Sequence, residues 1–389
     1  MITLRLAWRN LFGAGLRTWL NAVVLSLAFL SILTAQALLK GMNEQTERAM
    51  VATEYGGGQV LHPEYDRYDP LTISGAHGTP PPALQDLVDD GQAAAVLAVP
   101  GTIYPAGRIQ PVLLKGIDPR QQVVDLPTGL LAGRPEDIPV MLGARMAQST
   151  GLREGDAFTL QWRDRHGTFD AREARVAAVF RTQVQSVDRG QIWLPLSVLR
   201  RMTEMPREAT LVTLAPGVVA PGDAGWVFQG LDDLLADIRN LVRSKMIGSM
   251  FVYGILLFLV MLAIFDTRVF AIFKRQREIG TLVAMGMTRV QVARLFTLEG
   301  VLNAFLALVL AVVYGWPLLG WFARTGWRLP ETTDAYGYAL GDVLYPRFGV
   351  DVMVGTSLVI LVLAALVSYL PTRRITRVVA TDALRGRVF

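Results

Sequence analysis

The strongest constraint on this chain is a set of four long apolar windows that carry no formal charge. A helix needs about 20 apolar residues to cross the roughly 30 Å hydrocarbon core of a bilayer, and each window is long enough. The chain is 52% hydrophobic and only 18% charged, which is too apolar for an ordinary soluble protein. The sequence therefore predicts an α-helical membrane protein with four transmembrane helices, at residues 18–39, 246–265, 300–323 and 352–372.

The first window has a second interpretation, as a signal peptide. Three arginines precede it, and the run AQA at residues 35–37 resembles a signal-peptidase site. A signal-peptide apolar region usually spans about 7–15 residues, and this window is longer. We therefore expect a membrane anchor, and the other three helices would hold the protein in the membrane in either case.

The charged residues between the windows indicate how the helices are oriented. Segments 1–17, 266–299 and 373–389 together hold 14 basic and 4 acidic residues, whereas segment 40–245 holds 21 basic and 25 acidic ones. Lys and Arg accumulate on the cytoplasmic side of a membrane. We therefore expect an inner-membrane protein with both termini and the 266–299 segment in the cytoplasm. Segments 40–245 and 324–351 would lie outside it.

The net charge of +5 follows from this topology and does not indicate nucleic-acid binding, because no soluble module interleaves basic and aromatic residues. The chain has no cysteine, which excludes disulfides and thiolate metal sites. No G-x-x-x-x-G-K-[ST], H-E-x-x-H or G-x-S-x-G motif occurs, and the three histidines are scattered. We therefore expect no enzyme activity, no metal site and no bound cofactor in this chain.

Segment 40–245 is long enough to build a core of its own. Short β-favouring runs, separated by turn residues, alternate there with helical runs. The sequence predicts a mixed α/β extracytoplasmic domain inserted between the first two membrane helices. The predicted elements are strands at 59–62, 94–99, 112–117, 157–162 and 173–180, shorter strands at 192–194 and 210–214, and a helix at 82–90.

The residues after Gly230 show a different pattern. Aliphatic residues recur at helical spacing from Leu231 to Val242, and no proline separates them from the second membrane window. We predict one helix that leaves the membrane as an amphipathic stalk, and a weaker stripe after Leu39 suggests a similar extension of the first membrane helix. The alternative, which the sequence leaves open, is that residues 231–243 form a packed surface helix of the extracytoplasmic domain.

A charged and then apolar stretch, FKRQREIGTLVAMGM, occupies residues 273–287. Gly286 suits the left-handed position that ends a helix, and Thr288 and Gln291 have the spacing of a capping box. One helix is therefore expected to stop at Met285 and another to start at Thr288. Membrane anchoring would explain the basic residues, but it requires neither the Glu-Ile-Gly run nor the stop and restart.

The run RQREIGTLVAMGMTRVQVARLFTLEG, at residues 275–300, closely resembles the cytoplasmic signature of the FtsX/MacB/LolC–LolE superfamily of ABC-transporter permeases. LAWRNLFGAGLRTWL, at 6–20, is similar to the N-terminal amphipathic helix of that family. LPTRRITRVVATDALRG, at 370–386, is similar to its C-terminal tail, with the departure that Ala380 stands where the family has a proline.

The resemblance implies specific partners. Such permeases pair as dimers and bind two copies of a separate ABC ATPase, whose groove receives the cytoplasmic helix. ATP and Mg would be bound by that ATPase, and its closure would pull the stalks together. The positions that match the family motif would be the ATPase-coupling residues, namely Arg277, Glu278, Ile279, Leu282, Ala284, Met285 and Gly286.

The head carries LKGIDP at 114–119 and LGARMAQSTGLREGDAFTL at 142–160, which resemble lipoprotein-releasing permeases. The implied function is extraction of lipoproteins or other lipidated cargo from the inner membrane, together with a second permease, identical or paralogous. A periplasmic adaptor or carrier is a further candidate partner. Two alternatives stay open, which are MacB-like efflux of drugs or peptides and FtsX-like signalling to cell-wall hydrolases.

Two further sets of residues are candidates for function. Small side chains on one face of the third window would permit close approach of a second permease, although packing within the chain is an equal alternative. Methionines near the expected outer mouth of the first two helices would suit lipid chains, because thioethers adapt to irregular partners. The candidate dimer face is Ala307, Ala311 and Gly315, and the candidate lipid or cargo mouth is Met42, Met246 and Met250.

Overall fold

The structure is a computed structural model that describes residues 15–132, 138–182, 184–222, 225–328 and 343–372. The chain forms two compact units. The helical unit comprises Met1–Met42, Val242–Arg328 and Val343–Phe389, and the head comprises Asn43–Leu241 and Leu329–Asp342. The expected N-terminal helix at 1–17 lies almost entirely outside the described residues, and the tail at 373–389 lies wholly outside them.

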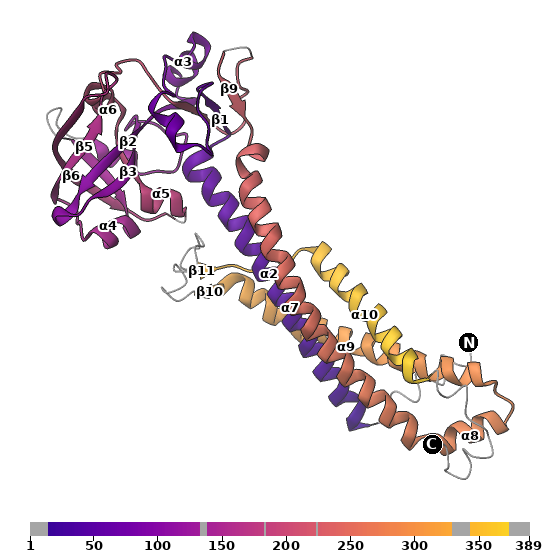
Figure 1. Ribbon diagram of the computed structural model, residues 1–389. Helices are drawn as coiled ribbons and strands as arrows, with labels where there is room; N and C mark the ends of the chain where they lie inside the picture. Colours follow the sequence, from indigo (N-terminus) through magenta and orange to yellow (C-terminus); the bar gives the residue numbers. More distant parts are fainter. Residues whose placement is uncertain (1–14, 133–137, 183, 223–224, 329–342, 373–389) are drawn as a thin grey trace. The chain divides into compact units, whose positions relative to one another are not determined.

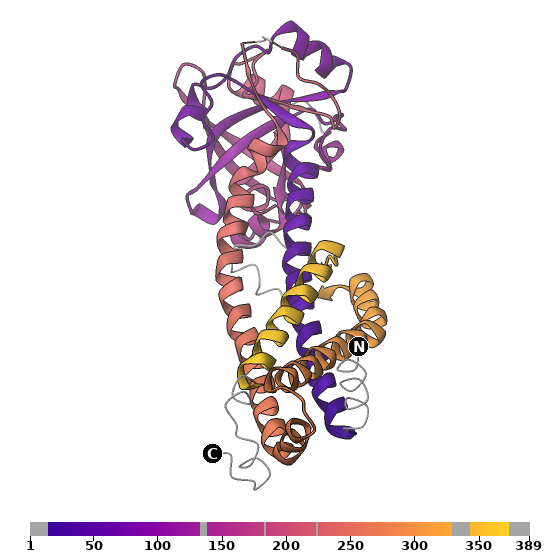
Figure 2. The same ribbon diagram turned by 90° about the vertical axis from the view of Figure 1, so that its right-hand side faces the viewer.

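Four of the described helices are long and apolar enough to cross a membrane, and they cover the four apolar windows of the sequence. They are α2 (Leu16–Met50), α7 (Leu231–Lys274), α9 (Arg289–Thr325) and α10 (Val350–Thr372) (Figure 1). The expected single helix after Gly230 is therefore present as α7, which continues to Lys274 without a break. A short helix, α8 (Gln276–Ala284), joins α7 to α9 (Figure 2).

Helices α2, α9 and α10 pack closely in the helical unit. Leu30 and Leu33 of α2 lie in one apolar cluster with Ala311 of α9 and Ile360 of α10. A Cβ atom added at Gly315 of α9 would come within 2.6 Å of Leu30 Cδ2, so a larger residue there would require the Leu30 side chain to shift. The packing contrasts with α7, where 6% of the most apolar stretch is buried within the chain.

The proposed dimer face on α9 is wrong. Ala307 and Ala311 are 2% and 1% exposed, and Gly315 is also buried. Ala307 shares a cluster with Ala22 and Leu25 of α2. Because α2 of the same chain covers this face, it is not available to a second permease, and the alternative of packing within the chain holds.

The segment before α10 is attached to α2. The Arg347 amide donates a hydrogen bond to the Ala37 carbonyl (2.8 Å), and Lys40 Nζ lies 2.8 Å from Asp351 Oδ2. Two short strands, β10 (Trp327–Arg328) and β11 (Val343–Leu344), pair just before this attachment. These contacts connect the C-terminal half of α2 with the segment between α9 and α10 and with the start of α10.

The head is built on a nine-stranded sheet in which six strands close into a ring. The strand order is β3-β7-β4-β6-β5-β2-β8-β1-β9, and β3 also pairs with β2, which closes the ring. Strands β8, β1 and β9 continue the sheet from β2. The strands are β1 (Gly58–Leu61), β2 (Ala93–Tyr104), β3 (Gln110–Ile117), β4 (Pro139–Gly143), β5 (Ala157–Arg163), β6 (Phe169–Phe180), β7 (Gln191–Pro195), β8 (Leu211–Leu214) and β9 (Val227–Gln229).

Short helices cover both surfaces of this sheet. Consecutive side chains of β4 and β7 point to opposite surfaces and join different apolar clusters. Val140 and Leu142 of β4 lie in one apolar cluster, whereas Met141 between them lies in another. Ile192 and Trp193 of β7 divide in the same way. The short helices of the head are α3 (Pro82–Asp89), α4 (Ala144–Thr150), α5 (Gln185–Gly190), α6 (Leu196–Met202), the π-turn η1 (Val51–Tyr55), and the 3₁₀ turns η2 (Pro70–Ser74), η3 (Pro105–Gly107) and η4 (Thr128–Leu131).

The two long helices pack against each other where they belong to the head. Leu234 and Leu235 of α7 are buried against Tyr55, which follows α2. Arg239 of α7 lies 3.5 Å from Glu47 of α2, an exposed pair of modest strength. Residues 231–241 therefore belong to the head, as the interpretation of a packed surface helix predicts. They also continue without a break into the apolar part of α7, as the interpretation of a stalk predicts.

Candidate functional site

The candidate site is the segment that joins α7 to α9. Helix α8 ends at Ala284, one residue before the expected stop, and Gly286 follows with a φ of +97°. The capping box is confirmed, since the Gln291 amide donates to Thr288 Oγ1 (3.3 Å) and the Thr288 amide donates to Gln291 Oε1 (2.8 Å). Local sequence signals thus fix both the end of α8 and the start of α9.

One face of α8 packs against the first turns of α9. Ile279 is 4% exposed and shares an apolar cluster with Val292 and Phe296 of α9, and Leu282 packs on its edge. Two of the expected ATPase-coupling residues, Ile279 and Leu282, therefore hold α8 in place and do not form an outer contact surface. This packing makes α8 part of the helical unit and not a free loop.

Arg275, at the N-terminal end of α8, connects this segment to α9. Its Nε and Nη2 atoms donate to both carboxylate oxygens of Glu278 (2.6 and 2.5 Å), and Nη1 donates to Glu299 Oε2 on α9 (2.7 Å). The guanidinium also lies 4.8 Å from the ring centroid of Phe296. Hydrogen bonds to Glu278, together with the charge of Glu299, hold the pKa of Arg275 above its usual range.

Sequence analysis missed this arrangement, which we call the Arg275 clamp (Arg275, Glu278 and Glu299). A bidentate guanidinium pair fixes geometry as well as charge, so the clamp sets the angle between α8 and the start of α9. Glu278, expected to contact the ATPase, is bound to Arg275 within the chain and remains exposed. The near-complete burial of Glu299, at 6% exposure, makes the clamp costly to break.

Exposed residues of the segment occur along α8 and in the turn that follows it. Arg277, Ala284 and Gly286 are exposed, and Met285 is 69% exposed. Val290, in the first turn of α9, is 52% exposed and was not expected to take part. We call Ala284, Met285, Gly286 and Val290 the α8 tip. An exposed methionine and valine beside a tight turn are suited to insertion in an apolar groove.

A cavity of about 430 Å³ lies between α2, α7 and α10 near the start of α10. We call it the outer cavity after the side of the membrane that charge predicts for this end of α10. Met250 and Tyr253 of α7 line it, and Thr356 Oγ1 donates to Gln36 Oε1 (2.9 Å) in its wall. Of the three methionines expected at a cargo mouth, Met250 lines this cavity. Met42 is half-buried and is not among its lining residues, and the Met246 side chain lies outside the described part of the structure.

The acidic and histidine side chains of the described residues are scattered or paired with each other. Among these residues, no group of three or more His, Cys, Asp or Glu side chains could hold a metal ion. His77 and Glu208 form an ion pair in the head, and His62 lies edge-on to Trp226, so these two histidines have structural partners.

The described chain thus has four helices long and apolar enough to cross a membrane, an α/β unit between the first two, and a clamped helix between the second and third. Residues 250–380 match the family described as FtsX-like permease C-terminal. This part of the chain is therefore similar to the C-terminal domain of FtsX-like permeases. A comparison with curated proteins found no match.

Two solved structures are similar to part of this chain at low identity. The periplasmic region of MacB from Actinobacillus actinomycetemcomitans is 12% identical, with a TM-score of 0.32, and the match covers 48% of this chain and 94% of that one. The extracellular domain of the noncanonic ABC-type transporter YknZ from Gram-positive bacteria is 13% identical, with a TM-score of 0.26, and covers 42% and 84%. Neither TM-score is high enough to support a conclusion about the fold of the head. The fold of the head is described by its own strand order.

Proposed function

We propose that this chain couples ATP hydrolysis by a separate ABC ATPase to movement of its head, and that it extracts lipidated cargo from the inner membrane. The observation that carries the proposal is the clamped α8 with its exposed tip. A partner that pushes on Met285 would move a rigid body, because Ile279 packing and the Arg275 clamp resist bending.

The path of movement follows from helix continuity. Arg275 directly follows Lys274, the last residue of α7, so displacement of α8 acts on the end of a 44-residue helix. That helix is unbroken to Leu231, where it packs against Tyr55 in the head. The partner ATPase would hold ATP and Mg and supply the closing stroke, whereas this chain would supply the lever.

The membrane topology in this proposal rests on charge. The segment with α8 and both chain ends carries the excess of basic residues, which supports a cytoplasmic location. The head, with more acidic than basic residues, would lie in the periplasm. A second permease, identical or paralogous, would cover α7, whose most apolar stretch is only 6% buried within this chain.

The cargo assignment rests on the outer cavity. Its volume of about 430 Å³ and its position between α2, α7 and α10 suit an acyl chain that enters from the lipid. Met250 is exposed on its wall and can adjust to a flexible chain. A polar substitution, Met250→Gln, is expected to reduce cargo release while leaving ATPase binding unchanged.

The proposal is tested by purifying the protein in detergent from its native membrane and identifying bound proteins and lipids. We expect an ABC ATPase and a lipidated protein to co-purify, and Met285→Asp to lose the ATPase only. Recovery of the ATPase with a periplasmic adaptor and no lipidated protein would replace lipid extraction by efflux. Recovery of a cell-wall hydrolase would replace it by signalling.

A further inference from the structure

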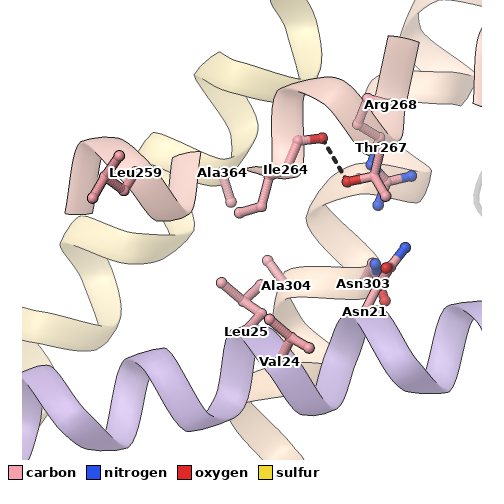
Figure 3. Close-up of a pocket in the computed structure, with 11 residues that line it drawn as sticks. Asn21, Val24, Leu25, Leu259, Ile264, Thr267, Arg268, Asn303, Ala304 and Ala364 are labelled. Atoms are coloured by element: carbon pink, nitrogen blue, oxygen red, sulfur yellow. Dashed lines mark hydrogen bonds between the residues drawn. The ribbon is translucent and has the colours of Figure 1, made fainter. Parts of the chain in front are cut away.

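A second cavity, of about 380 Å³, lies among all four long helices of the helical unit (Figure 3). It is separate from the outer cavity and shares no lining residue with it. Asn21 is near the start of α2, Arg268 is near the end of α7, and Asn303 is near the start of α9. The cavity therefore lies toward the end of the unit that carries α8.

The cavity has one polar end. Figure 3 shows the Arg268 guanidinium directed toward Asn303 and Asn21, with Thr267 beside them. Asn303 is 8% exposed, and its Oδ1 atom has no hydrogen-bond partner. Buried polar side-chain atoms are nearly always hydrogen-bonded in folded proteins. An unpartnered buried amide that lines a cavity points to a ligand that bonds to it.

Arg268 is available to such a ligand. The carboxylate of Glu299, one residue before Gly300 of the cavity wall, is held by Arg275 (2.7 Å). Within the described ranges no ion pair joins Arg268 to a carboxylate, although the nearby charge of Glu299 acts on its guanidinium. Because the Glu299 carboxylate is hydrogen-bonded to Arg275, the N–H groups of Arg268 can donate to an anion, and their planar fork suits the oxygens of a phosphate.

The other end of the cavity is apolar. Leu25 of α2, Leu259 and Ile264 of α7, Ala304 of α9 and Ala364 of α10 form its walls (Figure 3). The polar end faces the α8 side, which charge places at the membrane surface, and the apolar end faces the membrane interior. A phospholipid has the same order of groups along the same direction, with its phosphate at the surface.

We propose that this cavity binds a glycerophospholipid with an anionic headgroup from the leaflet on the α8 side. Arg268 donates to the phosphate, and Asn303 Oδ1 accepts from a headgroup hydroxyl. One acyl chain lies against Leu259 and Ala364. The site differs from the proposed cargo mouth in its leaflet and in its charged group, and a bound lipid would link α7 to α9 beside the Arg275 clamp.

The test is native mass spectrometry of the delipidated full chain in detergent, titrated with phosphatidylglycerol. We expect Arg268→Gln to weaken binding by about tenfold or more, because a charge-assisted hydrogen bond is lost. Val24→Trp, at the exposed rim, should weaken it by filling the entrance. Arg294→Gln is the matched control, because it removes the same charge from an exposed site outside the cavity.

Each contrary result has a definite meaning. Equal binding by Arg268→Gln and Arg294→Gln, with both variants unfolding at the wild-type temperature, overturns the proposal. Displacement of phosphatidylglycerol by inorganic phosphate alone would identify a soluble anion site instead. If phosphatidylglycerol binds only after residues 1–14 are deleted, that segment is the occupant and the lipid assignment is wrong. Arg268→Lys, which keeps the charge, should retain part of the affinity if the variants fold.

Discussion

At the residue scale, Arg275 is the side chain on which the proposed movement most depends. It forms three hydrogen bonds to two carboxylates and lies over an aromatic ring, and these partners come from α8 and α9. Glu299 is nearly buried, so loss of Arg275 would leave a carboxylate in an environment that disfavours charge. The sequence alone could not reveal this link, because Arg275 and Glu299 are 24 positions apart.

Substitution of Arg275 by Gln should destabilise the helical unit by about 1–3 kcal/mol, since a buried carboxylate loses its charged partner. Thermal unfolding in detergent measures the change. Arg277→Gln is the matched control, because Arg277 is two residues away and exposed, and it should shift stability by less than about 0.5 kcal/mol. Equal effects of the two substitutions would show that the clamp contributes nothing specific.

Met285→Asp, unlike Arg275→Gln, should reduce binding of the ATPase and leave the stability of the chain unchanged. Met285 is 69% exposed, so the charge costs the folded chain little, whereas an aspartate in an apolar groove of a partner would be desolvated. Binding of the ATPase should fall by about tenfold or more in a pull-down titration, with unfolding unchanged. Thr281→Asp, on an exposed part of α8 outside the tip, should bind as wild type does. Retained binding by Met285→Asp would remove the α8 tip from the interface.

At the element scale, most helices and strands follow from the sequence because their signals are local. The four membrane helices are long apolar runs, and α8 and α9 have a glycine stop and a capping box. Strand β4 was missed because both of its faces are buried, so PVMLG shows no polar alternation. The assignment of Ile279 to internal packing and of Met285 to the surface required the fold, since both are apolar residues of one short helix.

The contact between α9 and α10 depends on Gly300. A Cβ atom there would meet the Ser368 hydroxyl and would lie 2.5 Å from Ser368 Cβ. Gly300→Ala should therefore destabilise the helical unit by about 1–3 kcal/mol, measured by thermal unfolding in detergent. Gly320→Ala, on the same helix with open space around it, should be neutral or slightly stabilising. Equal stability of both variants would contradict the close approach of α9 and α10.

In the head, a buried ion pair attaches the π-turn after α2 to the sheet. Lys115 Nζ on β3 lies 2.7 Å from Glu54 Oε1 and 5.1 Å from the ring centroid of Trp193. Lys115→Met should destabilise the head by about 3–5 kcal/mol, because Glu54 stays buried without a counter-charge. Lys115→Met with Glu54→Gln should recover part of that loss. Failure of the second substitution to restore any stability would contradict a direct pairing of the two charges.

At the scale of the whole molecule, we propose that α7 transmits the movement, because its first residues belong to the head and its last residue directly precedes Arg275. In the proposal, each role belongs to a different part of the chain. The α8 tip would bind the ATPase, the Arg275 clamp would pass the displacement to α7 and α9, and the outer cavity would hold an acyl chain. Disruption of the clamp should therefore separate ATPase binding from movement of the head.

The most direct measurement uses the absence of cysteine in the chain. Asp233→Cys places a single spin label on an exposed site of α7 in the head, and pulsed electron resonance reports the distance between two permease copies in the ATPase complex. ATP with Mg should shorten this distance with an intact clamp, and should leave it unchanged with Arg275→Gln although the ATPase remains bound. An equal shortening in both, or none with the intact clamp, would contradict the lever.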